Sequence, residues 1–236
     1  MTVREAAYLR ADASGPGTCF RRLTKLPLDV ECNQDGAMVM ERPGLATGMV
    51  DPLDRERARL FALLGRLLSA PPDADLLARI RGVQGDATPF GRSLAGLAEA
   101  ASRTDSTRVE REYFALFIGV GRGELLPYAS YYLTGFLHER PLAELRATLA
   151  TLGIARAEGV AEPEDHLGFC CEVMAGLLEG RFRGGEAGAF FIRHLAPWAG
   201  RCFADLEGAE AAGFYKAVGA LGRTAIEIEQ AAAALP

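Results

Sequence analysis

Lysine is nearly absent from this chain of 236 residues, and so is any excess of positive charge. Lys25 and Lys216 are the only lysines among 26 basic residues, and the formal net charge is −5 at pH 7. Proteins that bind nucleic acid or an anionic membrane surface usually carry a basic face. No apolar run approaches the roughly 20 residues that a membrane-spanning helix needs. We therefore expect no nucleic-acid partner and no stable membrane insertion.

The chain also lacks the features of an exported protein. Arg4, Glu5 and Arg10 interrupt the first ten residues, so no apolar signal-peptide core begins there. A secreted disulfide framework needs an even number of cysteines at regular spacings, but this chain has five and no Cys-x-x-Cys pair. Reduced thiols in a cytoplasmic protein are the simpler interpretation. The five are Cys19, Cys32, Cys170, Cys171 and Cys202.

Helical signals dominate from Asp51 onward. Asp51-Pro52 and Thr88-Pro89 each combine a helix-capping residue with proline at the first helical position. No window shows the sustained alternation of polar and β-branched residues that predicts a strand. The sequence predicts an all-α fold: one domain of about eight to ten helices over 51–236. Residues 1–50 show neither the 3.6-residue period of a helix nor the two-residue period of a strand, and are expected to form an irregular N-terminal extension.

Several helix boundaries can be predicted from caps and breakers. A helix from Asp105 or Ser106 through Phe117 should end at Gly119. Further helices are expected over 52–70, 73–80, 88–101, 141–153, 163–180, 186–206 and 209–234, the one over 186–206 being kinked near Pro197. The segment Pro127–Leu133 should lead into one more short helix.

The densest polar cluster is Glu162-Pro163-Glu164-Asp165-His166, at the start of a predicted helix. Carboxylates in a first helical turn are what the helix dipole favours, so an ordinary capped N-terminus explains the acids. It explains His166 less well, because a cation there would oppose the dipole, and a neutral imidazole is expected. His166 lies one turn before Cys170 at the edge of an apolar stripe, and should point into a groove.

Catalytic and metal chemistry find little support in this cluster. His166 and Cys170 supply two ligands, whereas a zinc site needs three or four. Asp165 and His166 are adjacent, so their side chains project about 100° apart on a helix, and Asp165 cannot readily orient the imidazole. The glycines of Gly119–Gly123 follow a helix and lack the spacing of a phosphate-binding loop. A small helical enzyme, metal-dependent or using Asp165 and His166 for acid–base chemistry, stays an alternative; we expect no metal and no cofactor.

Aromatic residues are concentrated in two segments, residues 113–117 and 128–132. An aromatic stripe at helical spacing is core by default, so Phe114 and Phe117 are expected inside. Tyr128, which follows Pro127 beyond a glycine-rich connection, is less typical of a core. Tyrosines and prolines along a partly exposed groove suit an apolar peptide, and acidic rims would favour one that also carries arginine.

Three segments, in this order, resemble the TorD/DmsD family of molybdoenzyme maturation chaperones. They are Glu112–Gly119 running on to Pro127–Leu133, Glu162–Leu167 with the family's E-P-x-D-H signature, and His194-Leu195-Ala196-Pro197-Trp198 with the residues up to Tyr215. The resemblance implies an all-helical fold. It also implies a cytoplasmic chaperone that binds the twin-arginine signal peptide of a molybdopterin oxidoreductase precursor and holds back its export until cofactor insertion is complete.

The resemblance further implies a set of peptide-binding residues. Asp165 would pair with the arginines or polar groups of the signal peptide, and His166 would form a hydrogen-bonding wall. Some relatives carry tryptophans where this chain has Tyr113, Gly121 and Tyr128, so the shape of the apolar pocket differs. The implied set is Tyr113, Leu116, Phe117, Pro127, Tyr128, Pro163, Asp165 and His166.

The resemblance leaves the details of the partners open. The catalytic subunit itself is an implied partner, but formate dehydrogenase and DMSO or TMAO reductase are all consistent with the sequence. Some family members form domain-swapped dimers or bind guanine nucleotide weakly, and nothing in these residues decides either property here. A helical adaptor whose groove binds another protein's helix is a third alternative, beside the chaperone and the enzyme.

Overall fold

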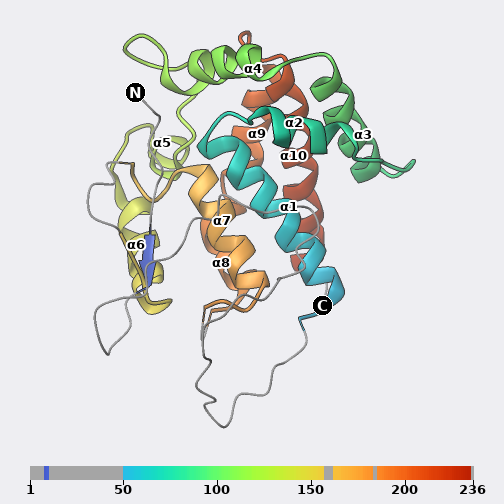
Figure 1. Ribbon diagram of the computed structural model, residues 1–236. Helices are drawn as coiled ribbons and strands as arrows, with labels where there is room; N and C mark the ends of the chain where they lie inside the picture. The colour runs from blue at the N-terminus through green and yellow to red at the C-terminus, as the bar shows by residue number, and fades with distance from the viewer. Residues whose placement is uncertain (1–7, 11–49, 157–161, 183–184, 235–236) are drawn as a thin grey trace, which may run out of the picture.

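The computed structural model describes residues 8–10, 50–156, 162–182 and 185–234, with the backbone alone described for 8–10. Within these ranges the chain is almost entirely helical (Figure 1), which confirms the predicted all-α class. The helices are α1 (Pro52–Ser69), α2 (Ala74–Arg81), α3 (Pro89–Ser102), α4 (Ser106–Tyr113), α5 (Ala129–Thr134), α6 (Arg140–Thr151), α7 (Leu167–Leu178), α8 (Ala187–Phe190), α9 (Ala199–Gly208) and α10 (Phe214–Ala233), with π-helical turns η1 (Phe114–Ile118) and η2 (Phe191–Leu195).

The predicted caps begin the first four helices. Asp51, Asp73, Thr88 and Asp105 each precede a helix, and each side-chain oxygen accepts a hydrogen bond from a backbone N–H of the first turn. These bonds satisfy donors that have no partner within the helix. The local sequence therefore determines these starts without help from tertiary contacts.

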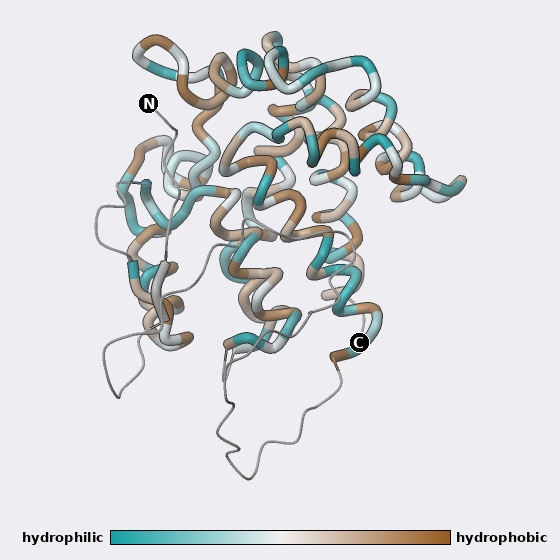
Figure 2. The backbone as a smooth tube through the Cα atoms, viewed as in Figure 1, coloured by the Kyte–Doolittle hydropathy of each residue, from teal (hydrophilic) through white to brown (hydrophobic). Residues whose placement is uncertain are grey.

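Helix α7 lies at the centre of the molecule. All its residues are buried except Glu172, which is mostly buried but keeps some exposed surface, as expected of a helix that is apolar on nearly all sides and enclosed by others. Helix α1 packs along α7, and α10 packs along both α9 and α3. The brown, apolar stretches of the tube in Figure 2 run through these central helices. Residues 162–166, which directly precede α7, are positioned by this core.

Three predicted boundaries in the second half of the chain are wrong. The helix expected from Pro163 begins at Leu167, because residues 163–166 form a turn that is paired with another segment. The helix expected over 186–206 with a kink near Pro197 is interrupted there: α8 and η2 precede Pro197, which lacks the backbone N–H that a continuous helix needs, and α9 follows it. The last helix begins at Phe214 and not near Ala209.

A short strand pairing was also not predicted. Strand β1 (Tyr8–Arg10) pairs antiparallel with β2 (Ile154–Arg156), which follows α6, in the register Tyr8↔Arg156. Three residues a strand are too few to show the alternation used for prediction. The remainder of the N-terminal extension expected over 1–50 lies outside the described residues, apart from Val50.

The carboxylate of Glu112, on α4, caps the first turn of α10. It accepts hydrogen bonds from the backbone N–H groups of Gly213 (2.7 Å), Phe214 (3.0 Å) and Tyr215 (2.6 Å). A carboxylate at this end of a helix also interacts favourably with the helix dipole. The sequence analysis missed this role, because the two partners are about 100 residues apart.

Replacing Glu112 with alanine should lower the free energy of unfolding by about 1–2 kcal/mol, since three backbone donors lose their acceptor. Urea denaturation of the full chain measures the change. Glu110, exposed on the same helix, provides the control, and its replacement with alanine should change stability by less than about 0.5 kcal/mol. Equal effects of the two substitutions would contradict the capping role.

Glu172 faces the contact between α7 and α1, where burial raises its pKa from 4.5 to about 7. The hydroxyl of Ser69 donates a weak hydrogen bond to its carboxylate at 3.4 Å and, like the charge of Arg66, opposes that rise. The folded protein therefore binds a proton that the unfolded chain has released between pH 4.5 and 7. Stability contributed by this group is present at low pH and is lost as pH rises through about 7.

The substitution Glu172→Gln should remove this pH dependence. At pH 8 the variant should be more stable than the parent by about 1–3 kcal/mol, because it has no charge to bury. At pH 4 the two proteins should be equally stable within about 0.5 kcal/mol. Urea titrations at both values measure the difference, and a variant that gains nothing at pH 8 would show that the carboxylate is solvated.

Candidate functional site

Two segments that are distant in sequence lie side by side at the N-terminal end of α7. Residues 127–130 and 162–167 pair through a β-bridge between Tyr128 and His166. The N–H of Ala129 donates to the carbonyl of Asp165 at 2.9 Å, and the N–H of Leu167 donates to the carbonyl of Pro127 at 2.8 Å. These bonds hold the glutamate–proline segment in a turn and explain why α7 begins only after it. We call this pair of segments the bridged site.

The bridged site brings together Pro127, Tyr128, Pro163, Asp165 and His166 of the predicted peptide-binding set. Pro127, Asp165 and His166 are buried, whereas Tyr128 and Pro163 are partly exposed. The rings of Tyr128 and His166 meet edge to face, with centroids 5.3 Å apart. Tyr128 and Pro163 are therefore the members of this group that present surface to a partner without rearrangement.

Acidic side chains surround the two rings. Asp165 is 1% exposed; its Oδ2 accepts a hydrogen bond from the N–H of Ser130 at 2.8 Å, and its Oδ1 has no partner among the described residues. The hydroxyl of Tyr128 donates to the partly exposed carboxylate of Glu162. Burial, followed by the contact with Glu162, raises the pKa of Tyr128, so its hydroxyl stays protonated. Two carboxylates thus lie beside the rings, and one of them has an unused buried acceptor.

The third carboxylate of the bridged site belongs to Glu164 and is bonded to a residue outside the site. Glu164 is 4% exposed, and its Oε2 pairs with the guanidinium of Arg146 on α6 at 2.8 Å. A buried carboxylate without this partner would be costly. Because its charge is already neutralised, Glu164 is a positioning residue, unlike Glu162 and Asp165.

His166 is the N-cap of α7 and is neutral, as the sequence predicted. Its Nδ1 accepts a hydrogen bond from the N–H of Gly168 at 3.1 Å, and burial lowers its pKa although Glu162 and Asp165 oppose the shift. An acceptor Nδ1 places the proton on Nε2, so Nδ1 cannot donate to Asp165 as in a catalytic triad. The geometry gives no support to the acid–base pair of the alternative hypothesis.

The other three predicted residues lie in an aromatic cluster between η1 and α10. The hydroxyl of Tyr113 donates to the carbonyl of Leu68 at 3.2 Å, and its ring lies 5.0 Å from that of Phe117. Leu116 is fully buried. Tyr113 and Leu116 are therefore core residues, whereas Phe117 is partly buried against Tyr215, with centroids 5.4 Å apart. A peptide could reach Tyr113 or Leu116 only after the core had opened.

The prediction that Phe114 lies inside is wrong. Phe114 and Ile118 are 46% and 45% exposed, and Val120, in the loop that follows, is 99% exposed. The π-helical turn explains the difference: the N–H of Gly119 bonds to the carbonyl of Phe114 five residues back, at 2.7 Å, which shifts the faces of the helix. A π-turn cannot be read from apolar spacing alone. We call Phe114, Ile118 and Val120 the exposed apolar surface.

The glycine-rich connection holds this surface close to α5. Gly119 and Gly121 adopt positive φ angles of 63° and 90°, and Leu125 returns to hydrogen-bond with Leu116. The guanidinium of Arg122 lies over the ring of Tyr131, 5.9 Å from its centre. The exposed apolar surface is thus joined by a short connection to the helix that begins directly after Tyr128.

The described ranges 8–10, 50–156, 162–182 and 185–234 show neither a metal site nor a membrane span. Those ranges contain no cluster of three or more His, Cys, Asp or Glu side chains able to hold a metal ion. In the same ranges, no helix combines the length and hydrophobicity required to span a bilayer. Cys170, Cys171 and Cys202 are free thiols, and burial raises the pKa of each.

Comparison with known proteins identifies relatives. The family model for the nitrate reductase delta subunit matches residues 84–204, just over half of the chain. Curated proteins from strains of Vibrio cholerae serotype O1, each named chaperone protein TorD, are 26% identical over 139 residues. That alignment covers 53% of this chain and 63% of the relatives, so the chain spans less than two thirds of their length.

A solved structure from Archaeoglobus fulgidus, described as a candidate redox enzyme maturation protein, aligns with 80% of this chain and 99% of its own, with 22% identity and a TM-score of 0.46. The family model includes η1, the bridged site and the His194–Trp198 segment. The first two segments of the predicted resemblance lie within this match, and so does the third as far as residue 204. The chain belongs to the nitrate reductase delta subunit family, which includes the TorD-like maturation chaperones.

Proposed function

We propose that this protein is a cytoplasmic chaperone that binds the twin-arginine signal peptide of a molybdopterin oxidoreductase precursor. In this proposal it acts without catalysis: it holds the signal peptide, delays export, and contacts the catalytic subunit while the cofactor is inserted. The family supports a role in redox-enzyme maturation, because the curated relatives are named chaperones. The client's identity is not part of the proposal.

The observation that carries the proposal is the acidic character of the bridged site. Asp165 has a buried carboxylate oxygen without a partner, and the carboxylate of Glu162 is bonded to an uncharged tyrosine hydroxyl. A guanidinium group satisfies two carboxylates well, because it presents several N–H donors in a fixed plane. The site therefore suits an arginine-bearing ligand that enters past Tyr128.

A signal peptide also carries an apolar segment, for which the exposed apolar surface is the proposed contact. Apolar side chains grouped at the surface of a soluble protein commonly mark a binding site. Phe114, Ile118 and Val120 lie on η1 and the connection that leads to Tyr128. One extended ligand could thus place its arginines at the bridged site and its apolar run along η1.

Binding of a synthetic peptide tests the proposal. The probe carries two consecutive arginines followed by an apolar run of about 7–15 residues. Asp165→Asn and Glu162→Gln should each weaken binding at least about tenfold, because each removes a charge that faces the guanidinium groups. Tyr128→Ala should weaken it as well. Fluorescence anisotropy with a labelled peptide measures the dissociation constants.

Matched controls separate this site from general acidity. Asp75→Asn on α2 and Glu99→Gln on α3 remove exposed carboxylates elsewhere and should leave affinity unchanged. A peptide with both arginines replaced by lysine should bind less well to the parent protein, since lysine cannot bind two carboxylates in one plane. Equal binding by the parent, Asp165→Asn and Glu162→Gln would overturn the proposal.

A further inference from the structure

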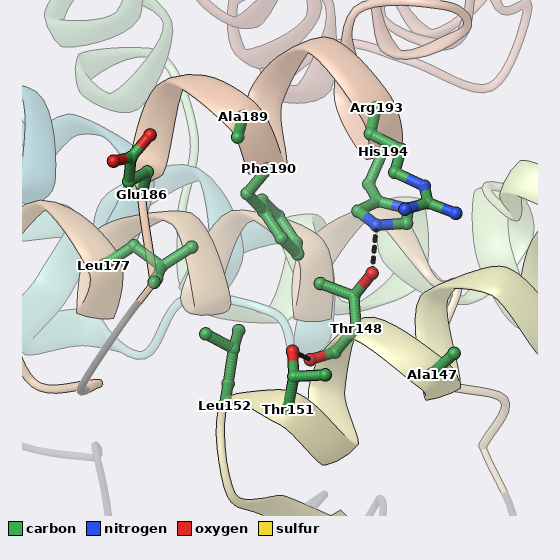
Figure 3. Close-up of a pocket in the computed structure, with 11 residues that line it drawn as sticks. Ala147, Thr148, Thr151, Leu152, Leu177, Glu186, Ala189, Phe190, Arg193 and His194 are labelled. Atoms are coloured by element: carbon green, nitrogen blue, oxygen red, sulfur yellow. Dashed lines mark hydrogen bonds between the residues drawn. The ribbon is translucent and has the colours of Figure 1, made fainter.

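A separate pocket opens between α6, α7 and the α8–η2 segment (Figure 3). Its volume is about 320 Å³, at the lower end of the range for small-molecule sites. None of its lining residues belongs to the bridged site or to the exposed apolar surface. The sequence analysis did not anticipate it, because its walls come from three separate segments of the chain: the end of α6, the end of α7, and α8–η2.

The floor of the pocket is apolar, and the polar groups on one side of it are hydrogen-bonded to each other. Leu152, Leu177 and Phe190 form an apolar floor. The hydroxyl of Thr148 donates to the carbonyl of Glu144 at 3.3 Å, so it accepts the Nε2–H of His194 at 2.8 Å. Burial, together with the charge of Arg193, lowers the pKa of His194 to about 4. His194 is therefore a neutral wall residue and not a binding charge.

Two opposite charges at the rim remain without partners. Neither the guanidinium of Arg193 nor the carboxylate of Glu186 makes an ion pair or side-chain hydrogen bond with the described part of the chain. Glu186 is the exposed N-cap of α8, and Arg193 is exposed on η2, seven residues further along the chain. Figure 3 shows them at opposite ends of the pocket, with Phe190 between.

We propose that this pocket binds a short apolar peptide with free ends, its carboxylate at Arg193 and its ammonium at Glu186. A short peptide with free ends carries one charge of each sign, and the two ends of the pocket carry the opposite charges. The apolar side chains would pack on Phe190, Leu152 and Leu177. A ligand with two anionic groups fits poorly, because Glu186 would repel one of them. This site is independent of signal-peptide binding.

Calorimetric titration of the full chain with the tripeptide Ala-Leu-Ala tests the site. The free peptide should bind the parent protein, and the same peptide acetylated at the N-terminus and amidated at the C-terminus should bind at least tenfold more weakly. Arg193→Gln and Glu186→Gln should each weaken binding of the free peptide at least tenfold. Ala189→Trp, which places a large ring at the pocket wall, should abolish it.

Two control variants and a double charge reversal make the outcome decisive. Arg111→Gln and Glu110→Gln change an exposed pair of the same charges on α4 and should leave affinity unchanged. The double variant Glu186→Arg/Arg193→Glu should bind at least tenfold more tightly than either single charge reversal, because the peptide can then bind in the opposite direction. The proposal fails if the parent protein does not bind Ala-Leu-Ala, if the blocked peptide binds equally well, or if the rim variants bind like the parent.

Discussion

Replacing Leu167 with alanine is expected to lower the free energy of unfolding by about 2–5 kcal/mol. Leu167 is fully buried as the first residue of α7, where that helix contacts both α1 and the bridged site. The substitution removes three buried carbon atoms and leaves a cavity that the surrounding helices fill only in part. Urea denaturation followed by circular dichroism measures the loss.

Two comparisons test the cause of this loss. Leu167→Met keeps most of the volume and should cost less than about 1.5 kcal/mol. Leu53→Ala removes the same atoms from a residue that is 67% exposed on α1, and should change stability by less than about 0.5 kcal/mol. A Leu167→Ala variant as stable as Leu53→Ala would show that α7 does not occupy the centre of the core.

The substitution Gly219→Val should destabilise the protein by about 3 kcal/mol, because it separates α10 from α9. A Cβ atom at Gly219 would lie 2.6 Å from the backbone nitrogen of Glu207 and 2.8 Å from the carbonyl oxygen of Phe203. Both neighbours are backbone atoms of α9, so no side-chain rotation can relieve the clash. The two helices pack this closely because glycine has no side chain at the crossing.

Gly200 supplies the matched control on the same pair of helices. A Cβ atom there would lie 3.6 Å from the Cγ2 of Ile226, which is an ordinary contact. Gly200→Ala should therefore be neutral or stabilise the protein by up to about 1 kcal/mol, since alanine favours the helix. Thermal denaturation of both variants compares the two, and equal melting temperatures would contradict the close approach of α9 and α10.

Helix starts were predictable where the signal is local. The caps at Asp51, Asp73, Thr88 and Asp105 act within one turn, so the sequence contains both the donor and the acceptor. The start of α7 was predicted four residues too early, at Pro163. Proline at a first helical position is compatible with a helix, but the pairing of residues 162–167 with 127–130 holds that segment in a turn.

The candidate site was predictable in part. The motif residues Tyr128, Asp165 and His166 meet in one place, as the groove hypothesis required, although their peptide-binding roles stay predictions. Burial was less predictable: Tyr113 and Leu116 are inside and Phe114 is exposed, because the π-turn η1 changes which side chains face the core. The pocket beside Arg193 had no signal in the sequence.

The sequence by itself determined the all-α class, the first four helix starts and the residues that form the bridged site. The class and the helix starts depend on patterns within a few residues, and the residues of the bridged site lie in two motifs that are each continuous along the chain. Only the tertiary structure decided which acids are neutralised, which aromatic rings are buried, and where two unpaired charges face one pocket. Those properties depend on contacts between distant segments, such as Glu164 with Arg146 and Glu112 with the first turn of α10, and local patterns carry no information about them.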